Sequence, residues 1–257
     1  MRWFTLVKIF LLSTFFINSY KASSQNFIAD TSAETPSLHN AVNLYHRFLY
    51  PETGLYDGSE YAYNLYYPFV INEGDPFFQS KQFDTGAVFY NNVLYKNVPL
   101  LYDVVKDELL THDPTNYYIV RLNNERVGWF TIWDHTFIRL NRDSANNVTL
   151  HAGYYDLLYN GNTPLYKKIL KIIKENSGSF QQGINKFTVE SDEYFIKKDS
   201  QYYAVKNKKG LLSLLNNKKK EIEQFIRKNK LNLKKDKDYA FIKAIAYYDE
   251  INNDKKN

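Results

Sequence analysis

Between Thr85 and Leu140, short apolar segments alternate with turn residues at nearly regular intervals. The Asn-Asn pairs at 91–92 and 123–124 stand where hairpins need positive φ, which Asn tolerates better than most residues. The Asp-Pro-Thr-Asn run at 113–116 matches a type I turn, with Pro preset for the second position. The pattern predicts an antiparallel meander.

Between residues 100 and 105, apolar residues stand at both even and odd positions, which point to opposite faces of a strand. We therefore expect that strand to be buried on both faces, or to have one face covered by other parts of the chain. Residues 152–159 predict a further strand, closed by the hairpin signal Asn160-Gly161. Residues 187–205 predict a strand pair that turns at 198–201. Residues 165–174 fit a helix by spacing and a strand by hairpin context; we favour the strand.

Residues 38–49 have apolar positions at helical spacing, and Pro51 is expected to end that helix. Helical periodicity returns after Gly210, where Asn216 or Asn217 is expected to cap one helix and Asp236 or Asp238 a last one. The expected inward residues of these two helices are Ile222, Phe225 and Ile226, and Phe241, Ile242, Ile245, Tyr248 and Ile251.

These elements predict an α+β protein: an antiparallel, strongly twisted or partly closed β-sheet meander with C-terminal helices packed on it. The expected segments are a signal peptide (1–24), a flexible leader (25–37), a β-rich domain (38–205), a C-terminal helical segment (206–252) and a disordered tail (253–257).

The composition supports the β-rich prediction. The 257 residues include 23 Tyr and 18 Phe against 10 Gly and a single Met, and Tyr and Phe favour strands. The chain has no cysteine, which excludes a disulfide, a lipid-modified cysteine and a catalytic cysteine.

The first residues resemble an export signal. Arg2 and Lys8 give the chain a basic start, and residues 9–17 form a mostly apolar run. The small residues at 22–24 permit cleavage after Ser24. Whether the signal is removed or retained as an anchor stays open. No later stretch approaches the roughly 20 apolar residues of a membrane-spanning helix. We therefore expect an exported protein, periplasmic or associated with the outer envelope, with no integral span after signal removal.

Charge is divided along the chain. Removal of residues 1–24 lowers the formal net charge from +5 to +2. Residues 25–196 carry 13 basic and 20 acidic side chains, whereas residues 197–257 carry 17 basic and 8 acidic ones. An acidic body is thus followed by a basic C-terminal region.

Four blocks follow one another in a familiar order: LYDGSEY, TGAVFYNNVLYKNVPLLYDVVKDEL, GYYDLLYNGNTPLYKKILK and KKGLLSLLNNKKKEIEQFIRKNKLNLKKDKDYAFIKAIAYYDE. Together they resemble a set of uncharacterised exported proteins of Gram-negative envelopes. The resemblance covers most of the chain after residue 24. It implies compartment and layout, and an extended block at 165–174, but it assigns no activity and no functional residue.

Candidate chemistry is sparse. The histidines His39, His46, His112, His135 and His151 show no metal-ligand spacing, and no phosphate-binding loop, dinucleotide fingerprint or serine elbow is present. Asp103, Asp107 and Glu108 surround one expected hairpin turn, where carboxylates are usually solvated. We therefore assign no catalytic residue, no metal and no cofactor.

Paired tyrosines are the candidate binding-face residues: Tyr66 and Tyr67, Tyr117 and Tyr118, and Tyr154 and Tyr155. Neighbours on a strand face opposite ways, so one of each pair is expected to be exposed, where it binds a sugar, peptide or protein. The alternative is that these rings fill the edge of the core with their hydroxyls in water.

Lys218, Lys219 and Lys220 are the candidate anion-facing residues, for lipid or lipopolysaccharide. The alternative is a solvated helix face whose helix docks on the acidic body. Nucleic acid is not expected, because no recognition motif is present.

The leading functional hypothesis is a non-enzymatic binding module of the periplasm or envelope, whose partner is an envelope protein, a glycan or a lipid. A carrier of an apolar, lipid-like ligand, held in a curved sheet with the helices as a lid, is the alternative. A hydrolase ranks third. A continuous apolar cavity favours the carrier, an exposed apolar patch the interaction module, and converging ionisable side chains the enzyme.

Overall fold

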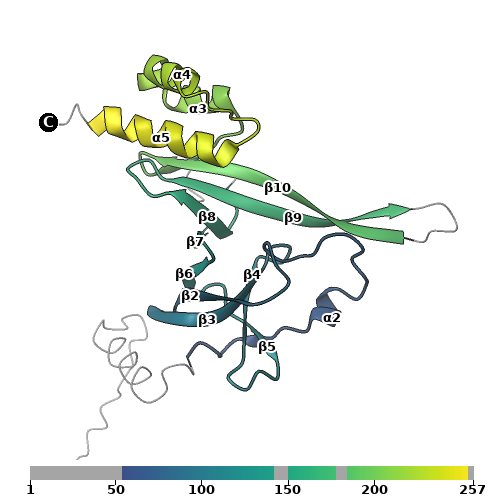
Figure 1. The fold of residues 1–257 in the computed structure, drawn as a ribbon. Helices are drawn as coiled ribbons and strands as arrows, with labels where there is room; N and C mark the ends of the chain where they lie inside the picture. Colours follow the sequence, from purple (N-terminus) through teal and green to yellow (C-terminus); the bar gives the residue numbers. More distant parts are fainter. Residues whose placement is uncertain (1–53, 142–149, 178–183, 254–257) are drawn as a thin grey trace, which may run out of the picture. The chain divides into compact units, whose positions relative to one another are not determined.

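A computed structural model describes residues 54–141, 150–177 and 184–253. These residues form one open antiparallel sheet of eleven strands, followed by helices (Figure 1). The predicted α+β class is confirmed. The expected helix at 38–49, the signal peptide, the leader and residues 254–257 of the expected tail lie outside the described residues.

The strands differ greatly in length. Their bounds are β1 (Ser59–Glu60), β2 (Asp84–Tyr90), β3 (Val93–Asp103), β4 (Glu108–His112), β5 (Ile119–Arg121), β6 (Val127–Ile132), β7 (His135–Leu140), β8 (Gly153–Tyr159), β9 (Leu165–Ser177), β10 (Ile184–Lys198) and β11 (Gln201–Ala204).

One short helix precedes the main run of strands, and the other helices follow it. Their bounds are α2 (Tyr63–Tyr66), α3 (Lys208–Leu214), the 3₁₀ turn η1 (Asn216–Lys218), α4 (Lys219–Lys228) and α5 (Lys237–Asn253). No described helix has the length and apolar character needed to cross a membrane.

The sheet curls around its main core. The strand order is β1-β5-β4-β3-β2-β6-β7-β8-β9-β10-β11. Side chains from β2, β3, β4, β6, β7, β8 and β9 meet in a single buried cluster, which includes Tyr90, Tyr102, Phe130, Phe137 and Tyr154. Because one face of seven strands converges on this cluster, the sheet must be strongly curved, although it remains open.

Local turn chemistry fixes several connections as predicted. Asn91 and Asn92 have φ of 52° and 62° between β2 and β3, and Asp199 and Ser200 have φ of 49° and 63° between β10 and β11. Both loops have the two positive-φ residues of a type I′ hairpin. The 113–116 turn is closed by the Asn116 N–H, which donates to the Asp113 carbonyl at 2.9 Å.

The prediction of a hairpin turn at Asn123-Asn124 is wrong. Neither residue has positive φ, and β5 does not pair with β6. Instead β6 pairs with β2, on the edge of β2 that β3 leaves open, and the Asn91 N–H donates to the Arg126 carbonyl at 2.8 Å. The connection therefore leads from β5 to the far edge of β2, which the curvature of the sheet permits.

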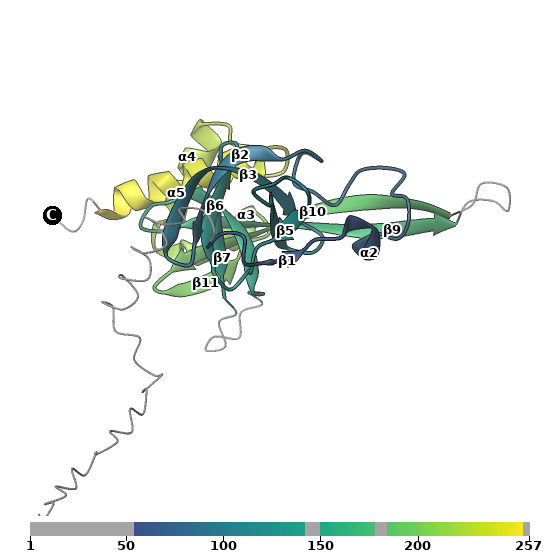
Figure 2. The ribbon, with the colours of Figure 1, turned by 90° about the horizontal axis from the view of Figure 1, so that it is seen from below.

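Residues 165–174 form a strand, as the hairpin context predicted. They belong to β9, which pairs with β10 from Leu165 to Ser177. Figures 1 and 2 both show the outer parts of β9 and β10 projecting together as a two-stranded arm. Segment 72–73 joins this arm, since the Asn72 N–H donates to the Lys186 carbonyl at 2.8 Å.

The second half of β3 is buried on both faces, as its apolar pattern predicted. Leu100 and Tyr102 enter the main core, while Leu101 packs with Tyr61 and Phe77 on the opposite face. The chain before β2 therefore covers the second face of β3, and β1 pairs with β5 at the sheet edge.

The C-terminal helices dock on β8, β9 and β10 through a separate apolar cluster. Ile222, Ile226, Phe241, Ile245 and Tyr248 are buried in it, as predicted, together with Leu165 and Ile196 of the sheet. Among the described ion pairs, the one that joins sheet and helix is Lys167 to Asp238 at 2.6 Å. There the cation lies on the sheet and the acid on the helix, the reverse of the expected arrangement.

Helix capping was predicted in part. The Asp236 carboxylate accepts the Tyr239 N–H, so it caps α5 as expected. Asn216 and Asn217 do not cap α4; they form the turn η1, and Lys218 precedes α4 without a side-chain cap. Helical structure starts earlier than periodicity alone indicated, because the Asn207 side chain caps α3.

Candidate functional site

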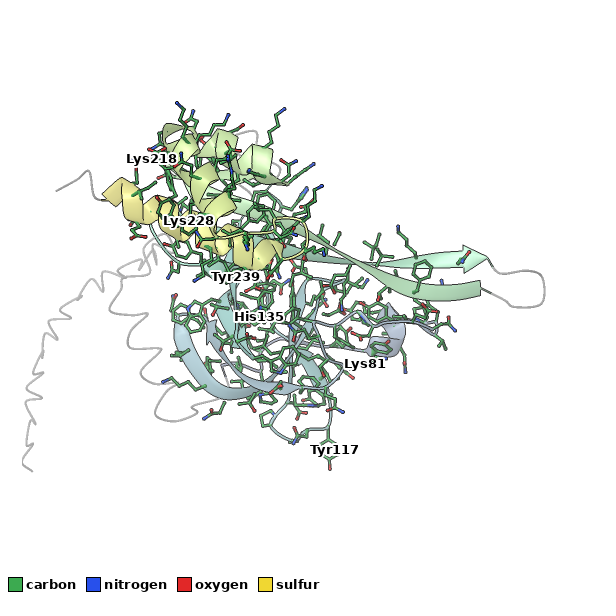
Figure 3. The ribbon with its side chains drawn as sticks, turned by 45° about the horizontal axis from the view of Figure 1, so that its top comes forward. Lys81, Tyr117, His135, Lys218, Lys228 and Tyr239 are labelled. Carbon is green, nitrogen blue, oxygen red and sulfur yellow. The ribbon has the colours of Figure 1, made fainter. Side chains whose placement is uncertain are left out.

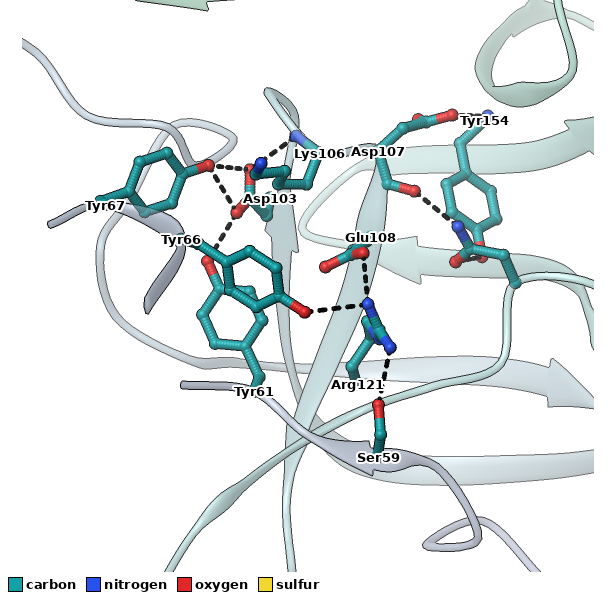
Figure 4. Close-up of polar contacts among 11 residues, drawn as sticks. Ser59, Tyr61, Tyr66, Tyr67, Asp103, Lys106, Asp107, Glu108, Arg121 and Tyr154 are labelled. Atoms are coloured by element: carbon teal, nitrogen blue, oxygen red, sulfur yellow. Dashed lines mark hydrogen bonds and ion pairs between the residues drawn. The ribbon is translucent and has the colours of Figure 1, made fainter. Parts of the chain in front are cut away.

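A buried carboxylate ties the chain before β2 to the end of β3. Asp103 is 0% exposed. The Tyr61 and Tyr67 hydroxyls donate to its Oδ2 at 2.6 and 2.8 Å, and the Lys106 N–H donates to its Oδ1 at 3.0 Å (Figure 4). Burial raises the pKa of Asp103, while these hydrogen bonds oppose the rise. The expectation of a solvated carboxylate at this turn is therefore wrong for Asp103, because the chain before β2 covers its side chain.

A second carboxylate of the same turn joins β3, β8 and β9. Asp107 accepts hydrogen bonds from the Tyr102 hydroxyl at 2.6 Å and from Lys168 Nζ at 2.8 Å. Lys168 also donates to the Tyr154 carbonyl at 3.1 Å. Gly153 borders this group with a φ of +153°, and an added Cβ would lie 2.1 Å from Asp107 Oδ2. A glycine is thus required for close approach of the strand to the ion pair.

The third acid, Glu108, pairs with Arg121 at 2.9 Å. Arg121 also donates to the Tyr66 hydroxyl at 2.9 Å and to Ser59 Oγ at 2.8 Å (Figure 4). The three acids around the β3–β4 turn therefore have separate partners, and each fastens a different part of the chain to the sheet.

An exposed apolar patch (Tyr63, Leu65, Phe69 and Val70) lies on the segment that Asp103 fastens. Leu65 is 81% exposed and Val70 is 76% exposed. A shallow hollow of about 660 Å³ is lined by Tyr63, Asn64 and residues 67–71, and Leu65 lies outside it. Tyr61 and Tyr67, on either side of α2, both bond to Asp103, and the Asn72 N–H donates to the Lys186 carbonyl, so the segment is held before, within and after the patch.

Two lysines flank the apolar patch, but they do not form a separate cationic site. Lys106 Nζ lies 5.2 Å from the Tyr66 ring centroid, and Lys186 Nζ lies 4.2 Å from that of Phe69. Lys186 also pairs with Glu175 on β9. These cations interact with the chain's own rings and acids.

The expectation that one tyrosine of each pair is exposed is wrong for Tyr154 and Tyr155. Tyr67, Tyr154 and Tyr155 are buried, and Tyr66 is half-buried against Arg121. Tyr154 and Tyr155 do point to opposite faces of β8, but each face is covered: Tyr154 belongs to the main core and Tyr155 packs with Phe195. Burial raises the pKa of both hydroxyls.

Tyr117 and Tyr118 are exposed, as the binding-face hypothesis requires. They follow the turn at 113–116, and Tyr117 is 89% exposed and points away from the sheet (Figure 3). Among the described residues, Tyr117 belongs to no apolar cluster, so this region lacks the extended apolar surface of a protein interface.

The three candidate anion-facing lysines differ in exposure. Lys219 and Lys220 are exposed, whereas the Lys218 side chain is only 11% exposed and lies 3.8 Å from Glu221. Figure 3 shows Lys218 and Lys228 on the helical part of the chain. The structure does not bring the three ammonium groups together as one site.

A histidine–aspartate pair lies apart from the apolar patch. His135 Nδ1 is 2.7 Å from Oδ2 of the buried Asp156, and the Gln79 carboxamide is 3.1 Å from Nε2. The hydrogen bond to Asp156 raises the pKa of His135, and Asp134 adds to the rise, while burial and, less strongly, Lys167 oppose it.

The His135 pair predicts a pH-dependent stability difference. A raised histidine pKa stabilises the fold fully below about pH 6.5, and this stabilisation is lost as the pH rises through the folded-state pKa. The deficit of His135→Gln in free energy of unfolding should therefore shrink as the pH rises from about 5.5 to about 9. Urea unfolding of both proteins measures it; a constant or growing deficit would contradict the pairing.

A hollow of about 550 Å³ lies between β10, the end of β11 and the start of α5, and its lining mixes the apolar Phe195 and Val205 with the charged Asp192, Glu193 and Lys237, so it is not the continuous apolar cavity that a lipid carrier requires. Side chains of the helix–sheet cluster, including Leu165, Leu211 and Phe241, are 0% exposed and occupy the space where a lidded ligand would lie. No three His, Asp or Glu side chains among residues 54–141, 150–177 and 184–253 are grouped so that they could hold a metal ion.

Comparisons of the chain with protein-family models, with curated proteins and with solved structures found no match.

Proposed function

We propose that this chain is an exported, non-enzymatic binding module of the periplasm or cell envelope, and that its apolar patch binds a partner protein. One observation carries the proposal: Leu65 and Val70 expose most of their side chains on a segment held in place by buried hydrogen bonds. Exposed apolar groups on a fixed backbone lose little conformational entropy on binding, so they suit a protein interface.

The surroundings of the patch favour a protein partner over a lipid surface. A shallow hollow beside Tyr63 and Phe69 can receive an apolar side chain of a partner. Lys106 and Lys186, the cations nearest to the aromatic rings, stack on the chain's own rings. They are therefore less available for anionic headgroups than a free basic cluster would be.

Export is supported by the sequence alone. The basic start, the apolar run to Ile17 and the small residues before Gln25 form a secretory signal pattern, and the absence of cysteine is compatible with an oxidising compartment. The resemblance to exported envelope proteins points the same way.

Quantitative co-purification tests the proposal. Tagged wild-type protein and the double variant Leu65→Asp with Val70→Asp are recovered from native envelope fractions, and co-purifying proteins are measured by mass spectrometry. We expect one partner in near-stoichiometric amount with the wild type and at least tenfold less with the double variant, because each carboxylate would have to be desolvated at the interface.

A matched control changes exposed aromatic residues away from the patch. Tyr117→Ser with Tyr118→Ser should retain the partner, since both rings are already exposed and their loss leaves the patch intact. Recovery of the same partner on the Leu65/Val70 variant, or of no partner on the wild type, would refute the proposal.

A further inference from the structure

Two neighbouring hollows form a groove beside the β2–β3 turn and the β5–β6 connection. The first, of about 650 Å³, is lined by Phe89, Asn91 and residues of β6 and β7. The second, of about 590 Å³, is lined by Asp57, Arg121 and Asn123 among others. Glu125 and Arg139 line both, so the hollows adjoin. Each has the volume of a typical small-molecule site.

The groove is polar but has no net formal charge. Three arginines (121, 126 and 139) face three acids (Asp57, Glu108 and Glu125). Arg121 is paired with Glu108, and Arg126 with Asp57. A polyanion would have to compete with these carboxylates, and an apolar ligand would have to desolvate them. The charge balance therefore favours an uncharged polar ligand.

Amide side chains line the groove, those of Asn91, Asn123 and Asn141 among them. The Asn124 side chain is held by two hydrogen bonds: its Nδ2 donates to the Asp107 carbonyl at 2.9 Å, and its Oδ1 accepts from the Tyr154 hydroxyl at 2.9 Å. Arg139 lies over the Tyr154 ring, 5.7 Å from its centroid. The Asn124 amide thus fixes the wall of the groove, and Arg139 is held in place before a ligand arrives, which reduces the entropy lost on binding.

A flat aromatic pair borders the first hollow. The rings of Phe89 and Trp129 are 6.0 Å apart and nearly parallel, at 5°, and both are partly exposed. An added Cβ at Gly128 would approach Phe89 Cδ1 to 3.0 Å, so the Phe89 ring packs directly on this glycine. An aromatic face next to amides and guanidinium groups suits a ligand with both C–H faces and hydroxyl groups.

We infer that this groove binds a neutral oligosaccharide. Hydroxyl groups donate and accept at once, which matches the mixed amides, arginines and carboxylates. The ring faces of the sugar would pack on Phe89. The adjoining hollows would extend contact to a second sugar unit. The site is separate from the apolar patch in its lining residues and makes no use of the proposed protein partner.

Calorimetric titration of the purified chain with maltohexaose, cellohexaose, xylohexaose and chitohexaose tests the inference, with hexagalacturonate as the acidic arm. We expect at least one neutral hexasaccharide to bind tighter than about 1 mM. Phe89→Ala and Arg139→Gln should each weaken that binding at least tenfold. Should Phe89→Ala fail to fold, Glu125→Ala serves instead, because Glu125 is exposed on the connection between β5 and β6.

The control variants separate this site from the apolar patch. Tyr117→Ser and Leu65→Asp should bind the sugar as the wild type does, because neither residue lines the groove. Failure of all four neutral sugars, binding of hexagalacturonate alone, or wild-type affinity in both Phe89→Ala and Arg139→Gln would overturn the inference.

Discussion

Asp103→Ala is expected to lower the free energy of unfolding by about 2–4 kcal/mol. The substitution leaves the Tyr61 and Tyr67 hydroxyls and the Lys106 N–H without their acceptor in a buried place. An unsatisfied buried donor costs about 1–3 kcal/mol, and relief from burying a charge offsets part of the sum. Urea unfolding at neutral pH measures the loss.

Asp103→Asn separates hydrogen bonding from charge. Asn keeps an acceptor for the tyrosines and removes the cost of burying a carboxylate, so its loss should be smaller than that of Ala. The raised pKa of Asp103 means that the folded state favours the protonated acid. Wild-type stability relative to Asp103→Asn should thus be highest below the unfolded value, about pH 3.9, and fall as the pH rises through the folded pKa.

Asp113→Ala provides a graded control. Asp113 has little exposed surface too, but its partners are local: the Thr115 N–H and hydroxyl and the Tyr118 N–H donate to it. Its replacement should lower the free energy of unfolding less than Asp103→Ala does, because it breaks only contacts within one turn. Equal losses at positions 103 and 113 would contradict the role assigned to the buried network.

Lys168→Met is expected to lower the free energy of unfolding by about 3 kcal/mol. Lys168 is almost fully buried, and its ammonium group bonds to Asp107 and to the Tyr154 carbonyl. Met preserves most of the side-chain volume, so the loss reports the charge left on Asp107 more than a cavity. Thermal and urea unfolding of the single variants and of the double variant with Asp107→Asn complete a mutant cycle.

The matched control is Lys208→Met. Lys208 pairs with Glu223 at 3.0 Å, close to the 2.8 Å of Lys168 and Asp107, but both partners are well exposed. A pair of this kind contributes little to stability, because solvent screens the two charges. Losses of similar size at 168 and 208 would show that burial adds nothing to the Lys168 pair.

Sequence reasoning succeeded where local chemistry decides the structure. Asn-Asn at 91–92 and Asp-Ser at 199–200 adopt the positive φ that short hairpins require, and the apolar stripe of α5 becomes buried. The hairpin context also decided 165–174 correctly against its helical spacing. These features depend on neighbours within a few residues.

The failures concern contacts between distant segments. Asn123-Asn124 resembles a hairpin turn, but β6 instead joins the free edge of β2. Tyr154 and Tyr155 alternate as a strand requires, yet the sheet curvature covers one and a second cluster covers the other. Asp103 has the sequence context of a solvated turn, but two tyrosines from about forty residues upstream enclose it.

The candidate surfaces were not predictable for the same reason. The sequence pattern of residues 63–71 does not distinguish Leu65, which is exposed, from Tyr67, which is buried. The groove gathers residues from the β2–β3 turn, the β5–β6 connection and β7, and no spacing in the sequence relates them. In the sequence, only the candidate pair Tyr66 and Tyr67 pointed to that segment.

Site-specific photo-crosslinking in the native envelope tests the central claim most directly. A photoreactive residue is introduced at Leu65, and in a separate variant at Tyr117, which is equally accessible but lies outside the patch. We predict a discrete protein adduct from position 65 and none from position 117. An adduct from 117 with none from 65 would contradict the account of the apolar patch as the surface through which this chain binds its partner.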